Sequence, residues 1–306
     1  MLQPGWGFEE LEEEREAVRV AFGDNSGYLL GRIPAGSTVI PRFRALPFGR
    51  ELEAEVALAG SELLNSYEEH RFAGDMGRWY PVFEGLTPRS WRGVENLPVG
   101  EEGPFFVKGE TNSRRQLWAT HSYAETRREL GSVIANLVAD SLIGHQDIWI
   151  REFVDLNIIG RDVSGMPTGE EYRVFFLDGV ELARGFYWRG GEEHFGDFVP
   201  RPEEIDHDLV AEVGERLLGN IRFCAVDFAR CVDDSWIVVE INDGCMSGLC
   251  GVDAFELWRS VAYVIENAAP GRRLVRACPY CVGEEADYHT MCFDAVFYID
   301  DDADGA

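Results

Sequence analysis

Two residues, Asp178-Gly179, separate two strand-like runs in the middle of the chain, Tyr172–Leu177 and Val180–Trp188. A two-residue Asp-Gly connection favours a tight β-hairpin, because both central residues of such a turn need positive φ values. A second hairpin is predicted further along, where Phe223–Phe228 and Ser235–Asn242 flank a short polar turn. The sequence therefore predicts antiparallel strand pairing in this half of the chain.

Helical patterns surround these hairpins. Apolar residues recur at a spacing of three to four in Ala124–Leu142, and helices are also expected over Pro202–Leu218 and Asp253–Asn267. Further strands are expected over Pro104–Lys108 and Asp147–Val154. Hairpins interspersed with helices predict an α+β fold, in which helices cover one side of antiparallel sheets.

The length of the chain, 306 residues, predicts more than one lobe. Proline and glycine are concentrated in residues 96–103, which are expected to form a linker. We therefore predict a small N-terminal α/β domain over residues 1–98, opened by an acidic arm. A central α+β domain over residues 99–267 and a C-terminal extension over residues 268–306 are predicted to follow.

The formal net charge of −27 argues against two classes of partner. Broad nucleic-acid binding and binding to an anionic membrane surface both require clustered positive charge. The sequence also lacks an apolar run of about eighteen residues, the length of a membrane-spanning helix, and the basic-then-apolar start of a signal peptide. A cytoplasmic protein that does not engage membranes is therefore expected.

The second hairpin carries the strongest chemical signal. Asp227 lies on its first strand, and Glu240 and Asn242 lie two positions apart on its second. Residues i and i+2 of a strand share a face, so Glu240 and Asn242 are expected to project together. Val239 and Ile241 are expected to face the core. Two carboxylates and an amide oxygen are ligands that suit Mg²⁺; the alternative is an ordinary polar strand face.

Lys108 is the only lysine in the chain, and it ends the predicted strand Pro104–Lys108. Arginine supplies every other basic side chain apart from the histidines. A lysine ammonium reaches phosphate as a compact point charge, and the planar guanidinium of arginine does not replace it everywhere. Lys108 is therefore either a phosphate ligand or an incidental basic residue at a strand end.

The order of these features resembles the ATP-grasp superfamily, whose members clamp ATP between two antiparallel sheets behind an N-terminal domain. The resemblance covers residues 36–267 and rests on five short motifs in the family's order. The motifs are Phe106-Val107-Lys108, Ile150-Arg151-Glu152-Phe153-Val154, Glu171-Tyr172-Arg173-Val174-Phe175, Ala225-Val226-Asp227 and Val239-Glu240-Ile241-Asn242.

The resemblance implies roles for individual residues. Lys108 would contact the ATP phosphates, Arg173 would reach either the triphosphate or an acyl-phosphate, and both would act in catalysis. Asp227, Glu240 and Asn242 would bind Mg²⁺. The other ATP-binding residues implied are the hinge segment Arg151, Glu152, Phe153 and Val154, which would meet adenine and ribose, and two further basic residues, Arg42 and Arg114.

Two departures from the family pattern concern the basic residues. The loop after Lys108 is polar and basic where the family often has a glycine-rich phosphate flap, so Arg114 and Arg115 either hold phosphate or are solvated. The second lysine that many members carry near the N-terminus is missing, and arginines such as Arg42 stand there instead. This pattern is similar to a little-characterised branch that pairs the lysine with arginines. That branch also resembles the grasp-fold chaperone that assembles a eukaryotic translation initiation factor.

The function implied by the resemblance is an ATP- and Mg²⁺-dependent ligase. Such an enzyme would join the carboxylate of an amino acid or peptide to an amine through an acyl-phosphate. A phosphotransferase with the same clamp and an ATP-binding assembly protein without ligase activity are the alternatives. The expected partners are ATP and a small-molecule or peptide substrate.

A separate motif lies near the C-terminus. Cys278, Cys281, His289 and Cys292 have the spacing Cys-x2-Cys-x7-His-x2-Cys. Three thiolates and one imidazole can form a tetrahedral Zn²⁺ site, although the interval before the histidine is short for familiar fingers. This segment is either a zinc knuckle or a tail with reduced, unligated thiols.

Overall fold

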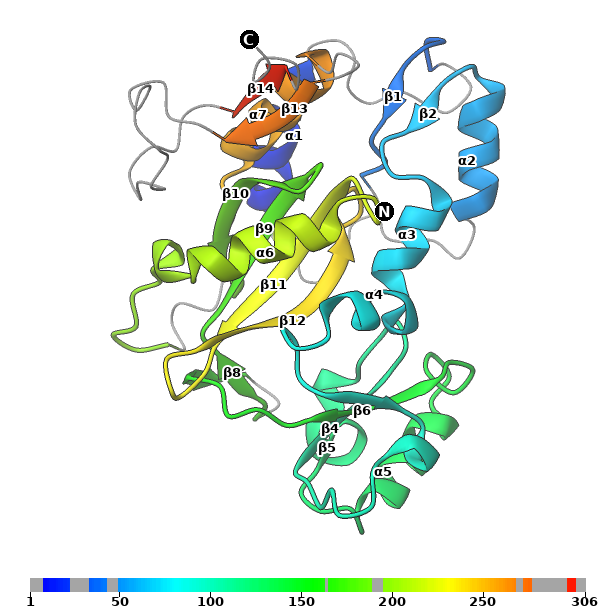
Figure 1. The fold of residues 1–306 in the computed structure, drawn as a ribbon, viewed down its shortest axis with the longest axis vertical. Helices are drawn as coiled ribbons and strands as arrows, with labels where there is room; N and C mark the ends of the chain where they lie inside the picture. The colour runs from blue at the N-terminus through cyan, green and yellow to red at the C-terminus, as the bar shows by residue number, and fades with distance from the viewer. Residues whose placement is uncertain are drawn as a thin grey trace.

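The computed structural model describes residues 8–22, 33–42, 49–162, 165–188, 195–267, 272–276 and 296–300. Two antiparallel sheets of four strands each form the centre of this described part. Figure 1 shows the larger sheet (β9–β12) in the middle of the molecule and the smaller one near one end. The predicted α+β fold is confirmed.

The large sheet has the strand order β10-β9-β11-β12. Its strands are β9 (Glu171–Leu177), β10 (Val180–Phe186), β11 (Phe223–Arg230) and β12 (Trp236–Asp243). Both predicted hairpins are present, β9–β10 and β11–β12. Asp178 and Gly179 connect the first pair with φ values of 50° and 79°, as expected for an Asp-Gly turn.

Helices bury both faces of the large sheet. On one face, Tyr172, Val174 and Phe176 of β9 pack against helix α6 (His207–Leu217). On the other face, the end of β9 packs against helix α7 (Ala254–Asn267), which also contacts helix α1 (Phe8–Phe22). Each fully buried aromatic side chain stabilises such a core by about 1.5–3 kcal/mol. The charged side chains of the large sheet can therefore gather only on the part of this second face that α7 does not cover.

The small sheet has the order β3-β6-β4-β5, and helix α5 (Leu130–Ala139) covers one of its faces. Its strands are β3 (Ser90–Arg92), β4 (Phe105–Gly109), β5 (Tyr123–Ala124) and β6 (Ile148–Glu152). Helix α5 is shorter than predicted for two reasons. Ala124 pairs with Phe105 in the sheet, and the Asp140 carboxylate accepts the amides of Leu142 and Ile143, which stops the helix.

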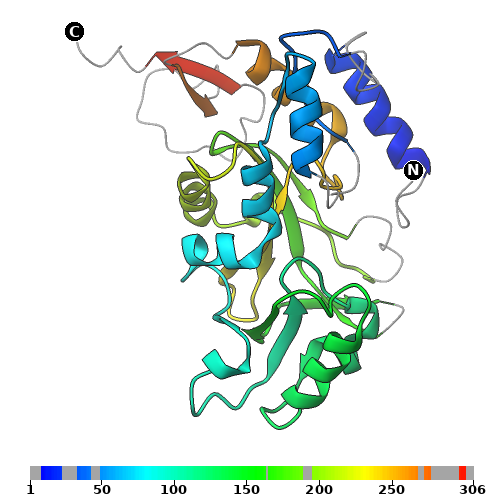
Figure 2. The same ribbon diagram turned by 90° about the vertical axis from the view of Figure 1, so that its right-hand side faces the viewer.

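The N-terminal part is a small parallel unit with two further helices. Strands β1 (Thr38–Val39) and β2 (Glu62–Leu63) pair in parallel around helix α2 (Gly49–Leu58). Helices α3 (Tyr67–Gly74) and α4 (Met76–Phe83) follow, and their apolar residues join the core beneath α6. Figure 2 shows α1 and α2 at the end of the molecule opposite the small sheet.

Short elements complete the described part: the 3-10 turns Val94–Asn96, Arg115–Leu117 and Pro202–Glu204, a π-helical turn at Trp118–Ser122, and the strand pairs β7 (Ile158–Arg161) with β8 (Pro167–Gly169) and β13 (Arg272–Arg276) with β14 (Val296–Asp300). Within the described ranges, every helix is too short or too polar to cross a membrane. Strand β3 belongs to the small sheet although it precedes residue 99, and the domain limits remain a prediction.

Candidate active site

Six charged side chains meet where the small sheet faces the free part of the large sheet: Lys108, Arg115, Glu171, Arg173, Asp227 and Glu240, called the charged cluster below. The link between the two sheets is direct, because Lys108 Nζ donates a hydrogen bond to Glu240 Oε1 at 2.7 Å. The cluster thus joins two sheets that carry different motifs of the sequence.

Lys108 reaches the cluster through the alternation of β4. Phe105 and Val107 point to the core under α5, so Phe106 and Lys108 occupy the opposite face, toward the large sheet. The Lys108 side chain is only 5% exposed, and Glu240 is the acidic group with which it pairs. An ammonium buried this deeply needs an anionic partner to offset the several kcal/mol lost with its hydration.

Arg173 and Asp227 stand directly opposite each other on β9 and β11. The Arg173 guanidinium donates to both carboxylate oxygens of Asp227 at 2.8 Å and to the Gly248 carbonyl at 2.7 Å. Burial raises the pKa of Asp227, and Arg173 acts against that rise. Burial disfavours the charged guanidinium as well, but Asp227 keeps the pKa of Arg173 above its ordinary value. Each group therefore depends on a partner of opposite charge.

Glu240 and Asn242 project toward the cluster together, as the strand alternation predicts. Glu240 faces Asp227 across the β11–β12 ladder, and Asn242 Nδ2 lies 3.4 Å from Asp227 Oδ2. Burial raises the pKa of Glu240, but Lys108, Arg115 and Arg151 together outweigh burial and bring the pKa to about 2. Glu240 is therefore an ionised, hydrogen-bonded carboxylate at neutral pH.

One expectation for this strand needs correction. Ile241 lies in the core as predicted, but Val239 is the extra residue of a β-bulge, because the register of β11 with β12 shifts between Asp227 and Phe228. Val238 is the fully buried residue instead. Such bulges re-aim side chains next to functional sites, and this one directs Glu240 toward Lys108.

Arg115 belongs to the cluster, whereas its neighbour Arg114 does not. The Arg115 guanidinium donates to the Tyr187 hydroxyl at 3.1 Å, and its charge interacts with Glu240 and Glu171. Arg114 instead forms two hydrogen bonds with Asp140, at 2.7 and 2.6 Å, and lowers the pKa of that carboxyl to about 2. The sequence reasoning selected Arg114, and the structure brings Arg115 into the cluster instead.

Glu171, a member of the charged cluster, and Tyr187, which lies beside it, are two residues that the sequence reasoning did not select. Glu171 is 9% exposed, and burial together with the charges of Asp227 and Glu240 raises its pKa to about 8. Burial raises the pKa of Tyr187 to about 12, and the Arg173 guanidinium lies 5.1 Å from the centre of its ring. The only signal available was their position on the hairpin that carries Arg173.

The predicted hinge segment divides between two roles. Arg151 is buried, and its guanidinium donates to Thr87 Oγ1, Ser90 Oγ and the Val239 carbonyl, while its charge also interacts with Glu240. Burial lowers its pKa to about 10. Glu152 forms hydrogen bonds with Arg89 near the surface. Phe153 instead joins an aromatic group with Phe106, Trp118 and Tyr123, whose ring centres lie 5.2–6.0 Å apart. Val154, which follows, is partly exposed.

Arg42 lies beside the cluster and not in it. Its guanidinium donates to Glu14 and to the carbonyls of Gly244 and Cys245, on the loop after β12. These partners occupy its donors, so the structure gives Arg42 the role of holding that loop. The predicted zinc ligands Cys278, Cys281, His289 and Cys292 lie outside the described residues.

The oxygen donors of the cluster fit Mg²⁺ shared with phosphate groups. Asp227 and Glu240 occupy facing positions with Asn242 beside them, and Mg²⁺ commonly takes one or two protein carboxylates together with water and phosphate oxygens. In the described ranges, His, Cys, Asp and Glu do not form a group of three or more that could hold a metal ion by themselves. The donor set therefore suits a cation that arrives with its substrate.

Comparison with known proteins agrees with this geometry. A sequence profile of the ATP-grasp domains, that of family 3 of the R-two-K clade, matches residues 97–261. The D-cycloserine synthetase DcsG has a similar structure, with a TM-score of 0.52 and 18% identity over 83% of this chain and 94% of that one. The ATP-grasp ligase PsnB, solved with a phosphomimetic variant of its minimal precursor, Mg and ADP, gives 0.51 and 12% over 86% and 94%.

At these identities the two structures show a shared fold. Curated protein sequences give no match. The family profile, in contrast, spans more than half of the chain, from the start of the small sheet's β4 region to α7. The chain therefore belongs to the ATP-grasp domains, in family 3 of their R-two-K clade.

Proposed function

We propose that this protein is an ATP-dependent ligase that joins a carboxylate of the amino-acid or peptide class to an amine. The observation that carries the proposal is the pairing of two buried cations from different sheets, Lys108 and Arg173, with the carboxylates Glu240 and Asp227. Membership of the ATP-grasp domains supports ATP as the substrate of this site.

Binding of ATP would exchange the partners within the cluster. Phosphate oxygens can take the hydrogen bonds that Lys108 and Arg173 now give to carboxylates, and Arg115 adds a third cation. The released oxygens of Asp227 and Glu240, together with Asn242, would hold Mg²⁺. When bound, Mg²⁺ neutralises part of the phosphate charge. The three cations and the carboxylates of Asp227 and Glu240 would thus have partners both with and without nucleotide.

The chemistry follows from this arrangement. A substrate carboxylate oxygen attacks the γ-phosphorus, the bond to the β–γ bridging oxygen breaks, and its electron pair leaves with ADP. The amine nitrogen then attacks the acyl carbon and gives up a proton to the departing phosphate or to water, and inorganic phosphate leaves as the amide forms. Lys108, Arg115 and Arg173 stabilise the charge that shifts to the phosphate oxygens, which is the main contribution a protein makes to phosphoryl transfer.

We place the adenine beside the aromatic group formed by Phe106, Trp118, Tyr123 and Phe153. Phe106 lies on the same face of β4 as Lys108, two residues away, so the base and the phosphates would lie along one strand. Phe153 precedes Val154 in the hinge segment. Flat apolar rings there offer the base a stacking surface.

An ADP-release assay with pooled amino acids and peptides tests the proposal. We expect ADP and phosphate only when a carboxylate donor and an amine acceptor are both present, together with an amide product. ADP with a phosphorylated hydroxyl product would instead establish a phosphotransferase. Tight ATP binding without turnover on any pool would establish a non-catalytic ATP-binding protein.

The Lys108→Met variant tests whether Lys108 belongs to the ATP-binding site. Removing a charged hydrogen bond of this kind typically costs about 1.5 kcal/mol or more, so ATP should bind about tenfold more weakly. Calorimetric titration with ATP measures this, and the melting curve reports folding. Unchanged ATP affinity in a folded variant would remove Lys108 from the site.

A further inference from the structure

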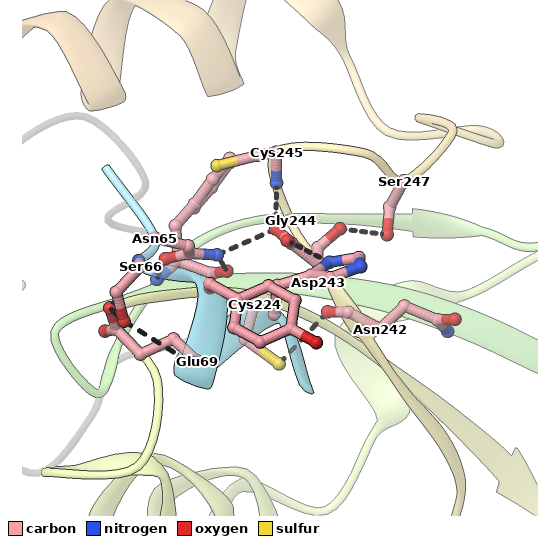
Figure 3. A network of polar contacts seen from close by, with 12 residues as sticks. Asn65, Ser66, Glu69, Cys224, Asn242, Asp243, Gly244, Cys245 and Ser247 are labelled. Atoms are coloured by element: carbon pink, nitrogen blue, oxygen red, sulfur yellow. Dashed lines mark hydrogen bonds and ion pairs between the residues drawn. The ribbon is translucent and has the colours of Figure 1, made fainter. Parts of the chain in front are cut away.

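Directly after Asn242, the Asp243 carboxylate enters a second polar network (Figure 3). Successive residues of a strand point to opposite faces, so this network lies on the other side of β12 from the charged cluster. His70 Nδ1 lies 2.9 Å from Asp243 Oδ2, and Asn65 Nδ2 donates to Asp243 Oδ1 at 2.7 Å. The Cys245 amide also donates to Oδ1, at 2.8 Å. Asn65, His70 and Asp243, called the polar latch below, connect the N-terminal part to the end of β12.

Asn65 clamps two strands at once. Its side-chain amide bonds both backbone groups of Phe223, donating to the carbonyl at 2.6 Å and accepting from the amide at 2.9 Å. The same amide group reaches Asp243 on the neighbouring strand. Asn65 therefore links the ends of β11 and β12 through additional hydrogen bonds, and at 4% exposure its side chain is shielded from competing water.

Helix α3, which carries His70 of the latch, is itself firmly placed. Ser66 and Glu69 form a capping box at the start of α3, which satisfies two amides that a helix end leaves unpaired. The other oxygen of Glu69 accepts the Arg222 amide at 2.9 Å, at the start of β11. His70 lies in the same first turns, so its ring is fixed relative to both strands.

The latch lies where the ladder ends. Asp243 is the last residue of β12 paired with β11, and Asn242 is the one before it. Beyond that pair the Asp243 carbonyl accepts the Ser247 hydroxyl at 2.6 Å. Arg42, which donates to the Gly244 and Cys245 carbonyls, and the bond from the Gly244 amide to the Phe223 carbonyl hold the same loop. The loop then returns to the charged cluster, where the Gly248 carbonyl accepts from Arg173. In Figure 3 the Asn242 side chain extends out of this network.

We propose that Asn65 and His70 are positioning residues which, through Asp243, fix Asn242 and the loop up to Gly248. The N-terminal part would thereby set the affinity of the site for its divalent cation. This inference rests on the proposed function, in which Asn242 is a Mg²⁺ ligand. Groups that orient metal ligands typically contribute about 10–100-fold to metal affinity.

His70→Leu and His70→Asn separate positioning from bulk packing. Leucine has similar volume and no hydrogen-bonding group, whereas the asparagine amide can donate near the position of Nδ1. Mn²⁺ serves as the probe, titrated into the protein saturated with ADP and followed by the electron paramagnetic resonance of free Mn²⁺. We expect the Mn²⁺ Kd to rise about tenfold in His70→Leu and to stay within about twofold in His70→Asn. ADP affinity without metal should not change.

Glu68→Gln is the matched control, because Glu68 lies on the same helix, is 63% exposed and pairs with Arg78 away from the latch. Its Mn²⁺ Kd should equal that of wild type. Ser247→Ala removes one hydroxyl and keeps the inference testable if the histidine variants do not fold; we expect about a threefold rise in Kd, a fraction of the latch effect.

The outcomes distinguish the two proposals. A Mn²⁺ Kd unchanged in folded His70→Leu and Ser247→Ala overturns the positioning role, and so does an equal loss of metal-free ADP affinity. If the wild-type protein binds neither ADP nor Mn²⁺ with ADP, the proposed function itself fails.

Discussion

Arg173 and Arg151 are both strand residues, and both are about equally buried, at 6% and 5% exposure, yet their surroundings differ in kind. Arg173 faces the carboxylate of Asp227, which keeps its pKa high. Arg151 faces two hydroxyls and a carbonyl, and burial lowers its pKa to about 10. The charged partner of an arginine can be replaced by a phosphate group, whereas neutral partners hold the guanidinium in a fixed structural position.

The two surroundings also connect different parts of the chain. Arg173 bonds within the large sheet and to the loop after it. Arg151 joins the small sheet to the segment before β3 and to the bulge residue Val239 of β12. The difference teaches that burial of a basic residue does not mark a ligand site; the charge and the exchangeability of its partners do.

The largest expected effect is on ATP turnover, and it concerns the oxygen donors of the charged cluster. Glu240→Gln combined with Asn242→Ala removes the charge of one carboxylate and the amide oxygen beside it, and we expect Mg²⁺-dependent ATP turnover to fall at least about 10³-fold. Thr87→Val, which removes a hydroxyl partner of Arg151, should lower stability by about 1–3 kcal/mol and leave the Mg²⁺ dependence unchanged. Turnover against Mg²⁺ concentration and urea unfolding measure the two quantities. Full Mg²⁺ dependence in the double variant would place the metal elsewhere.

The second test replaces each of the two arginines, Arg173 and Arg151, with methionine. Arg173→Met should reduce kcat for ATP turnover about 10²-fold, because a charge that stabilises the transferring phosphate is lost. Arg151→Met should change kcat less than about threefold, since the hydrogen bonds of its guanidinium go to neutral structural groups. Steady-state kinetics on both folded variants decides the matter. Equal losses of kcat would erase the distinction drawn between the two arginines.

Sequence reasoning found the parts of this site that regular strands determine. The Asp-Gly pair fixed the β9–β10 hairpin, and a period of two placed Glu240 and Asn242 on one face with Asp227 opposite. It could not foresee the bulge at Val239, because a bulge adds one residue without a distinctive sequence. The α+β fold followed from the same periodic signals.

Sequence reasoning selected Arg114 with no physical basis for preferring it to Arg115, because the two residues are identical neighbours in a loop without periodicity. Their roles are decided by partners distant in sequence, Asp140 for one and Tyr187 for the other. The partners of the Arg151 side chain could not be foreseen for a related reason, because they are hydroxyls contributed by another segment. The role of its hinge motif in adenine binding stays a prediction. Tertiary contacts of this kind leave no local pattern.

The third test uses these neighbours. Arg115→Met should raise the KM for ATP about tenfold, the effect of losing one charged hydrogen bond to phosphate. Arg114→Met should leave KM within about twofold, because Arg114 is engaged by Asp140 at the edge of α5. Both variants change the net charge equally, so a general electrostatic effect would alter both values alike and contradict the assignment.

The smallest expected effect is on stability, and it concerns Glu171, the carboxyl of the cluster whose pKa burial raises most clearly. Its pKa is about 8 in the folded protein against an ordinary value of 4.5. Between these values the folded state keeps a proton that the unfolded chain releases, so this group contributes less stability as pH rises. Glu171→Gln removes the titration, and its Tm should gain on that of wild type by about 3 °C or more from about pH 6 to about pH 8.

Glu152→Gln supplies the control of opposite sign, because Arg89 lowers the pKa of Glu152. Its stabilising charge is complete above the ordinary carboxyl range and is lost only as pH falls below it, so its Tm difference from wild type should stay flat from about pH 6 to about pH 8. Thermal unfolding followed by circular dichroism gives both series. A flat difference for Glu171→Gln as well would mean that Glu171 is ionised in the folded state. The cluster would then hold three carboxylates against three cations, and the comparison of charged with neutral partners would extend to Arg115.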